Sequence, residues 1–83
     1  MPGINWKLIH NAINNYEKYP PELRIAKYLF KNSITEKDFD DMGKSALFSL
    51  PSPVIIKIQN ELRNMHNGFY SEKTLKLIPE LEI

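Results

Sequence analysis

Apolar residues recur with a helical period along most of the chain, and the first such run covers residues 5–19. At about 100° per residue, its apolar side chains gather on one side, and lysine, histidine and asparagine lie opposite. Pro20 and Pro21 end the run, because proline donates no backbone hydrogen bond and disfavours a helical conformation in the residue before it. The pattern predicts an amphipathic helix over 5–19 whose core face is Trp6, Leu8, Ile9, Ala12, Ile13, Tyr16 and Tyr19.

Two further helices are predicted between residues 21 and 50. Pro21 suits the first position of a helix that runs to about Asn32, since no N–H donor is needed there. Thr35 is a good N-cap for the next helix, and the acidic residues after it favour the positive helix end. Gly43 weakens that pattern, so residues 44–50 are either its continuation or a separate short turn. The expected core residues are Leu23, Ile25, Ala26, Leu29 and Phe30, followed by Phe39, Met42, Ala46 and Leu50.

A fourth helix has clear signals at both ends. Ser52 and Pro53 form an N-cap and first-position pair, and Asn67-Gly68 is typical of a helix stop. Ser71 is then positioned to cap a short fifth helix that runs through Ile78. The final ten residues also alternate between apolar and polar, which would instead give a strand that resembles a wing. The expected core face of the fourth helix is Val54, Ile55, Ile58, Leu62 and Met65, with His66 at its margin.

Length and composition limit the fold and the function. A chain of 83 residues makes one domain whose core only just offsets the entropy lost on folding, so a homodimer would add useful buried area. Its 42% hydrophobic and 25% charged residues are near the globular average, and its longest aliphatic run is too short to cross a bilayer. Without cysteine, and without the apolar run of a signal peptide, we expect a cytoplasmic protein that does not interact with membranes. The predicted fold class is all-α, a compact domain of four or five short helices.

Charge alternates in blocks along the chain. Residues 1–31 carry a net +3, residues 36–41 carry −3, residues 42–76 carry +3, and the C-terminal tail carries −2. Within the first block, Arg24, Lys27 and Lys31 fall on one stripe of the second helix with Tyr28 beside them. Such a stripe is either a solvated helix face or a surface that meets phosphates or an acidic protein.

The polar side of the fourth helix is the second candidate surface. It carries arginine, asparagine and glutamine, which are able to pair with base edges in a major groove. Ile56 lies at the centre of this polar side, and it is either a single exposed apolar residue or an anchor for a partner. The full side consists of Ile56, Lys57, Gln59, Asn60, Arg63, Asn64 and Asn67, with Glu61 at its flank.

Two hypotheses for the function follow. The leading one is a small non-enzymatic regulator that binds DNA through a helix-turn-helix-like arrangement of the second to fourth helices. The alternative is an inhibitor or adaptor that docks on another protein, and the heavy use of Asn, Lys and Ile is compatible with a phage or mobile-element origin. The binding residues in either case are Arg24, Lys27, Tyr28, Lys31, Ile56, Lys57, Gln59, Asn60, Arg63, Asn64 and Asn67.

The sequence does not contain a recognisable catalytic or cofactor motif. Gly43-Lys44-Ser45 resembles the end of a phosphate-binding loop, but Asp38 stands where that loop needs glycine. The acidic cluster at residues 36–41 lacks the spacing of a calcium loop, and neither His10 nor His66 has a partner at zinc-like spacing. We therefore expect no catalytic residue, no metal, no cofactor and no small-molecule substrate.

Overall fold

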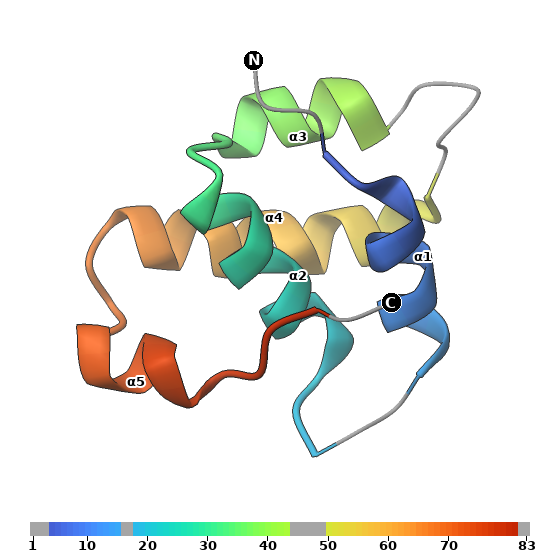
Figure 1. Ribbon diagram of the computed structural model, residues 1–83. Helices are drawn as coiled ribbons and strands as arrows, with labels where there is room; N and C mark the ends of the chain where they lie inside the picture. Colours follow the sequence, from blue (N-terminus) through green and yellow to red (C-terminus); the bar gives the residue numbers. More distant parts are fainter. Residues whose placement is uncertain (1–3, 16–17, 44–49, 82–83) are drawn as a thin grey trace.

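The computed structural model describes residues 4–15, 18–43 and 50–81, and these residues form helices and no strand. The helices are α1 (Trp6–Asn14), α2 (Pro21–Lys31), α3 (Glu36–Gly43), α4 (Ser52–His66) and α5 (Glu72–Leu77). In Figure 1, α4 lies at the centre, with α3 alongside it and α2 crossing it. The helix pair α2 and α4 makes the most extensive contact, while α3 packs on α4 and α1 packs on α2. The predicted all-α fold is confirmed.

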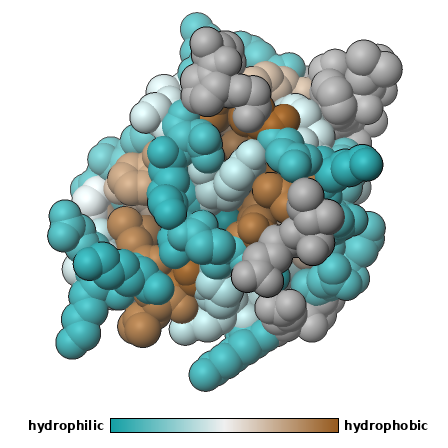
Figure 2. All heavy atoms as spheres, in the orientation of Figure 1, coloured by the Kyte–Doolittle hydropathy of each residue, from teal (hydrophilic) through white to brown (hydrophobic). Residues whose placement is uncertain are grey.

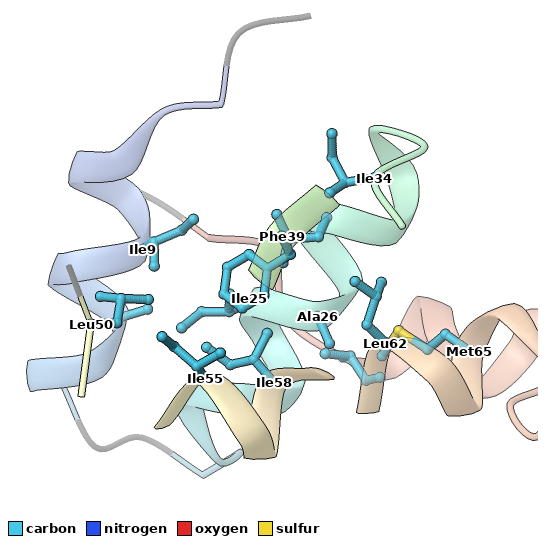
Figure 3. Close-up of a cluster of buried hydrophobic side chains, with 13 residues drawn as sticks. Ile9, Ile25, Ala26, Ile34, Phe39, Leu50, Ile55, Ile58, Leu62 and Met65 are labelled. Atoms are coloured by element: carbon cyan, nitrogen blue, oxygen red, sulfur yellow. The ribbon is translucent and has the colours of Figure 1, made fainter. Parts of the chain in front are cut away.

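The core is one cluster of aliphatic side chains with a single phenylalanine among them (Figure 3). Phe39 of α3 is fully buried and points toward Ile25 of α2. The ring of Trp6 stacks on the ring of Phe39, with 6.3 Å between the centroids. Through this contact α3 and α1 are joined at one end of the core. The buried members of the cluster are Ile9, Ala12, Ile25, Ala26, Leu29, Ile34, Phe39, Leu50, Ile55, Ile58, Leu62, Met65 and Ile78.

Local signals mark three of the helix ends. The Thr35 hydroxyl accepts from the N–H of Asp38 at 3.2 Å, and the Ser71 hydroxyl accepts from the N–H of Thr74 at 3.1 Å. Gly68 has φ +80°, a left-handed conformation that glycine adopts without strain, and it follows Asn67 at the end of α4. These three predicted ends are confirmed. The helix at residues 72–77 also decides between the two predictions for the C-terminus in favour of a fifth helix.

Two predicted boundaries are wrong. Helix α4 begins one residue earlier than expected, with Pro51 as its N-cap, because the Pro51 carbonyl already accepts from the N–H groups of Val54 and Ile55. Helix α1 ends at Asn14, well before the two prolines, and Lys18 and Tyr19 lie outside it. The side chain of Asn14 bonds the His10 carbonyl at 3.2 Å, and such local bonds make asparagine a poor residue inside a helix. The predictions for Tyr16, Ala46 and the turn at residues 44–49 lie outside the described residues.

Candidate docking surfaces

The cationic stripe of α2 is covered by the chain's own C-terminal segment. Residues 78–81, which we call the C-terminal strap, run back across α2 after α5 (Figure 1). Arg24 Nη2 donates to the Glu80 carbonyl at 3.0 Å, and Lys27 Nζ donates to the Ile78 carbonyl at 2.6 Å. Arg24 and Lys27 are only 7% and 6% exposed as a result. Neither side chain therefore offers its charge to an outside partner in this arrangement.

Lys31 belongs to the same stripe but stays at the surface. Its Nζ lies 2.7 Å from Glu80 Oε1, and Lys27 Nζ lies 3.2 Å from the same oxygen. The hydrogen bond from Lys31, helped by Lys27, holds the pKa of the Glu80 carboxyl below its ordinary value of 4.5, although partial burial opposes the shift. The strap is thus fastened by two main-chain carbonyls and one carboxylate.

The lowered pKa of Glu80 predicts a pH-dependent contribution to stability. A carboxyl with a depressed folded-state pKa stabilises the fold above its unfolded pKa, and this is lost as the pH falls through the folded-state pKa. The free energy of unfolding of Glu80→Gln should therefore lie below that of the wild type at pH 7, by less than about 1 kcal/mol because the carboxylate is half exposed. Urea unfolding of both proteins between pH 7 and pH 3 measures this. A difference that stays constant down to pH 3 would contradict the assignment.

Tyr28, beside the stripe, is engaged in the fold as well. Its hydroxyl accepts from the backbone N–H of Asn5 at 2.9 Å and so holds the start of α1 against α2. The ring is half buried. Tyr28 is therefore a link between helices in this structure, and its phenol is only partly open to a partner.

Part of the polar side of α4 holds α3 in place. Arg63 Nε and Nη2 each lie 2.8 Å from Glu36 Oε2, and Arg63 Nη1 donates to Asn60 Oδ1 at 3.4 Å. Gln59 Nε2 donates to the main-chain carbonyl of Glu36 at 3.4 Å. Glu36 begins α3, so these contacts fix the first turn of α3 onto the middle of α4. Arg63 and Gln59 are consequently less available for an outside partner than the sequence indicated.

The remaining polar side of α4 is open to solvent. Lys57, Asn60 and Asn67 are exposed, and Asn64 is half buried. Ile56 is 55% exposed, which confirms that it is an apolar residue on a polar surface. A shallow hollow of about 420 Å³ lies beside it, lined by Asp40 of α3 and by Ser52, Ile55, Ile56 and Gln59 of α4. We call this hollow and Ile56 the α3–α4 surface.

The α3 side of this surface is acidic. Asp38 and Asp41 are exposed, and Asp40 is half buried at the edge of the hollow. Two of the acidic residues, Glu36 and Asp38, lie in the first turn of α3, where the positive helix end favours them. The surface therefore combines an exposed apolar side chain with neighbouring carboxylates. Across the described residues, no three histidine, cysteine or acidic side chains are grouped so that they could hold a metal ion.

Three features near the C-terminus were not predicted from the sequence. Phe69 precedes α5, and Leu77 is the last residue of α5. Their side chains are 76% and 63% exposed. A larger hollow lies between α2, α5 and the strap. The hydroxyl of Tyr70 donates to the Glu61 carboxylate, which raises the pKa of Tyr70 to about 12 and ties the start of α5 to α4. None of these three features follows from a helical repeat of apolar residues, so the sequence pattern does not predict them.

The two histidines lie in different surroundings. His66 Nε2 lies 3.0 Å from the Ile34 carbonyl, and its ring meets Phe30 edge-on at 4.9 Å between centroids. The interpretation of His66 as a hydrogen-bonded histidine at the edge of the core is confirmed. His10 is exposed on α1.

Comparisons with known proteins assign no relationship. No family model matches the chain, and no curated protein or solved structure shows significant similarity to it. Among the helices of the described segments, none has the length and apolar character needed to cross a membrane.

Proposed function

We propose that this protein is a small non-enzymatic regulator that docks on another protein through the α3–α4 surface. The observation that carries the proposal is Ile56, which is 55% exposed at the edge of a hollow and surrounded by polar residues. Exposed apolar side chains beside a hollow are typical anchors of protein interfaces. Two of the five residues that line the hollow, Ile55 and Ile56, are aliphatic, and they offer a place for an apolar side chain of the partner.

Charge indicates the chemistry of the partner. Asp40 lines the hollow, and Asp38 and Asp41 are exposed on the same helix, so a partner segment with lysine or arginine is complementary to the charge of α3. We therefore expect an amphipathic segment of another protein that carries a large apolar side chain close to a basic one. The apolar side chain would contact Ile56, and the basic one would face α3.

The positions of the cations favour protein docking over DNA binding. DNA binding by the sequence-predicted surface needs Arg24, Lys27, Lys31, Lys57 and Arg63 to act as one exposed cationic area. Arg24 and Lys27 are buried under the strap, and Lys31 and Arg63 are paired with glutamates. DNA binding is still a second candidate, because Lys57, Asn60 and Asn67 lie exposed on the same helix and belong to residue types that read base edges or contact phosphates.

Selection of peptides tests the proposal. A displayed library of random 15-residue peptides would be selected on the wild type, and the enriched peptides would then be measured against Ile56→Asp and Leu77→Asp. We expect enriched peptides that combine basic and apolar residues, a loss of affinity of at least about tenfold for Ile56→Asp, and less than about twofold change for Leu77→Asp. Leu77 is a matched control because it is exposed like Ile56 but lies on α5. Equal affinity for both variants would contradict docking at Ile56.

Other occupants of the surface give distinct results. Sedimentation of the protein alone would show a concentration-dependent dimer, abolished by Ile56→Asp, if a second copy were the partner. Titration into random-sequence duplex DNA at low and moderate salt would show binding that weakens steeply with salt if DNA were the target. We expect a monomer in the first experiment and no micromolar binding in the second.

A further inference from the structure

The hollow between α2, α5 and the C-terminal strap has the size and lining of a small-molecule site. Its volume is about 570 Å³, within the range of sites that enclose small ligands. Phe30 of α2, Leu75 of α5, and Ile78 and Pro79 of the strap provide its apolar wall. In Figure 2, apolar (brown) surface is visible between hydrophilic (teal) side chains toward the lower left, where Figure 1 places α5.

Charged side chains surround this apolar wall and favour an anion. Lys27, Lys31 and Lys76 line the hollow together with Glu72 and Glu80. Lys27 is buried and bonded to the Ile78 carbonyl, so Lys31 and Lys76 are the cations that an outside ligand can reach. Lys76 is exposed, and no carboxylate of the described segments lies within ion-pair distance of it. A cation near apolar surface is thus available at the α5 side of the hollow.

One carboxylate of the chain, that of Glu80, is already bound by lysines of the hollow. Glu80 Oε1 lies 2.7 Å from Lys31 Nζ and 3.2 Å from Lys27 Nζ, so two lysines converge on a single carboxylate oxygen. Glu80 is 51% exposed, so its carboxylate is in contact with solvent at the mouth of the hollow. Glu80 already occupies both lysines of α2, so an external carboxylate would have to share or replace the bond between Glu80 and the exposed Lys31.

We propose that this hollow binds an amphipathic carboxylate, with its aliphatic chain against Phe30, Leu75 and Pro79 and its head group between Lys31 and Lys76. Glu80 acts as an internal competitor for Lys31. This site uses different residues from the α3–α4 surface, so either proposal can fail without the other.

Titration of sodium decanoate, kept below its micelle-forming concentration, tests the proposal on the ¹⁵N-labelled full chain. We expect saturable amide shifts at Phe30, Leu75 and Ile78. Decyltrimethylammonium, which has the same chain with a cationic head, should cause much smaller shifts there. The absence of saturable shifts, shifts centred on Ile56, or equal binding of both amphiphiles would overturn the proposal.

Charge variants provide the matched comparison. Lys73 and Lys76 are both exposed on α5, but only Lys76 lines the hollow. Lys76→Glu should weaken decanoate binding at least about fivefold, while Lys73→Glu, on the same helix but outside the hollow, should weaken it less. Equal effects of the two variants would overturn the proposal.

Glu80→Gln separates a binding role from a merely structural one. Removal of the competing negative charge should tighten decanoate binding by about two- to fivefold, the size expected for one exposed charge interaction. If Glu80 only fastens the strap, the variant would loosen the wall of the hollow and weaken binding. Weaker or unchanged binding by Glu80→Gln would therefore contradict the competitor role.

Discussion

Phe39→Ala is expected to lower the free energy of unfolding by about 3–5 kcal/mol. Phe39 is fully buried, points into the core and stacks on Trp6, so its removal leaves a cavity where α1, α2 and α3 meet. The loss is large for a domain that is stable by only ~5–15 kcal/mol, and it corresponds to a fall in melting temperature of more than about 12 °C. Urea unfolding followed by circular dichroism measures it.

Lys37→Ala is the control for Phe39→Ala. Lys37 lies two residues away on α3 and is exposed, so its replacement should change the free energy of unfolding by less than about 0.5 kcal/mol. If Phe39→Ala lost no more stability than Lys37→Ala, α3 would not be part of the core. The α3–α4 surface would then lack the rigid support that the docking proposal assumes.

Ile78→Ala should cost about 2–4 kcal/mol of stability. Ile78 is 2% exposed and is the buried anchor of the C-terminal strap, while its own carbonyl accepts from Lys27. The truncated side chain would weaken the cover over Arg24 and Lys27. The variant should therefore unfold at lower urea concentration and exchange the amide protons of Ile78, Glu80 and Leu81 faster than the wild type.

The neighbouring residue provides the control for this second prediction. Leu77 is 63% exposed, so Leu77→Ala should leave the free energy of unfolding within about 0.5 kcal/mol of the wild type. Similar losses for the two variants would mean that the strap does not pack as described. The buried positions of Arg24 and Lys27 would then lose their explanation.

Local signals in the sequence were sufficient for three of the helix ends. Thr35, Ser71 and Gly68 each act through bonds or backbone angles within a few residues, so their roles are readable without the fold. The end of α1 was misplaced for a related reason. The side chain of Asn14 bonds the His10 carbonyl near the end of α1, ahead of the two prolines, and the apolar period alone gives no sign of this competing hydrogen bond.

The burial of Arg24 and Lys27 on the α2 stripe depends on contacts with residues that are distant in sequence. Arg24 and Lys27 bond to carbonyls 56 and 51 residues further along the chain. Because a helical period places charged residues on a solvated face by default, it does not reveal that another segment covers them. The alternating charge blocks did indicate this contact, because the negative C-terminal tail is complementary to the positive first block. Part of that alternation is internal pairing between Glu80 and the lysines of α2.

The unusual position of Ile56 was visible in the sequence, but its surroundings were not. The pattern alone placed an isoleucine on a polar helix side, and the structure confirms its exposure. The hollow beside it is formed with Asp40 of α3, which reaches α4 only because Phe39 is buried and Glu36 is held by Arg63. Tertiary packing is therefore what converts a single exposed residue into a candidate docking surface.

The most direct test of docking at the α3–α4 surface is chemical-shift mapping of the ¹⁵N-labelled protein with the tightest peptide from the selection. We predict that the perturbed amides cluster at Asp40, Ser52, Ile56 and Gln59, and that Ile56→Asp abolishes the changes while the amides of the strap stay unmoved. Perturbations confined to α2, α5 and the strap, or shifts that persist unchanged in Ile56→Asp, would contradict the account.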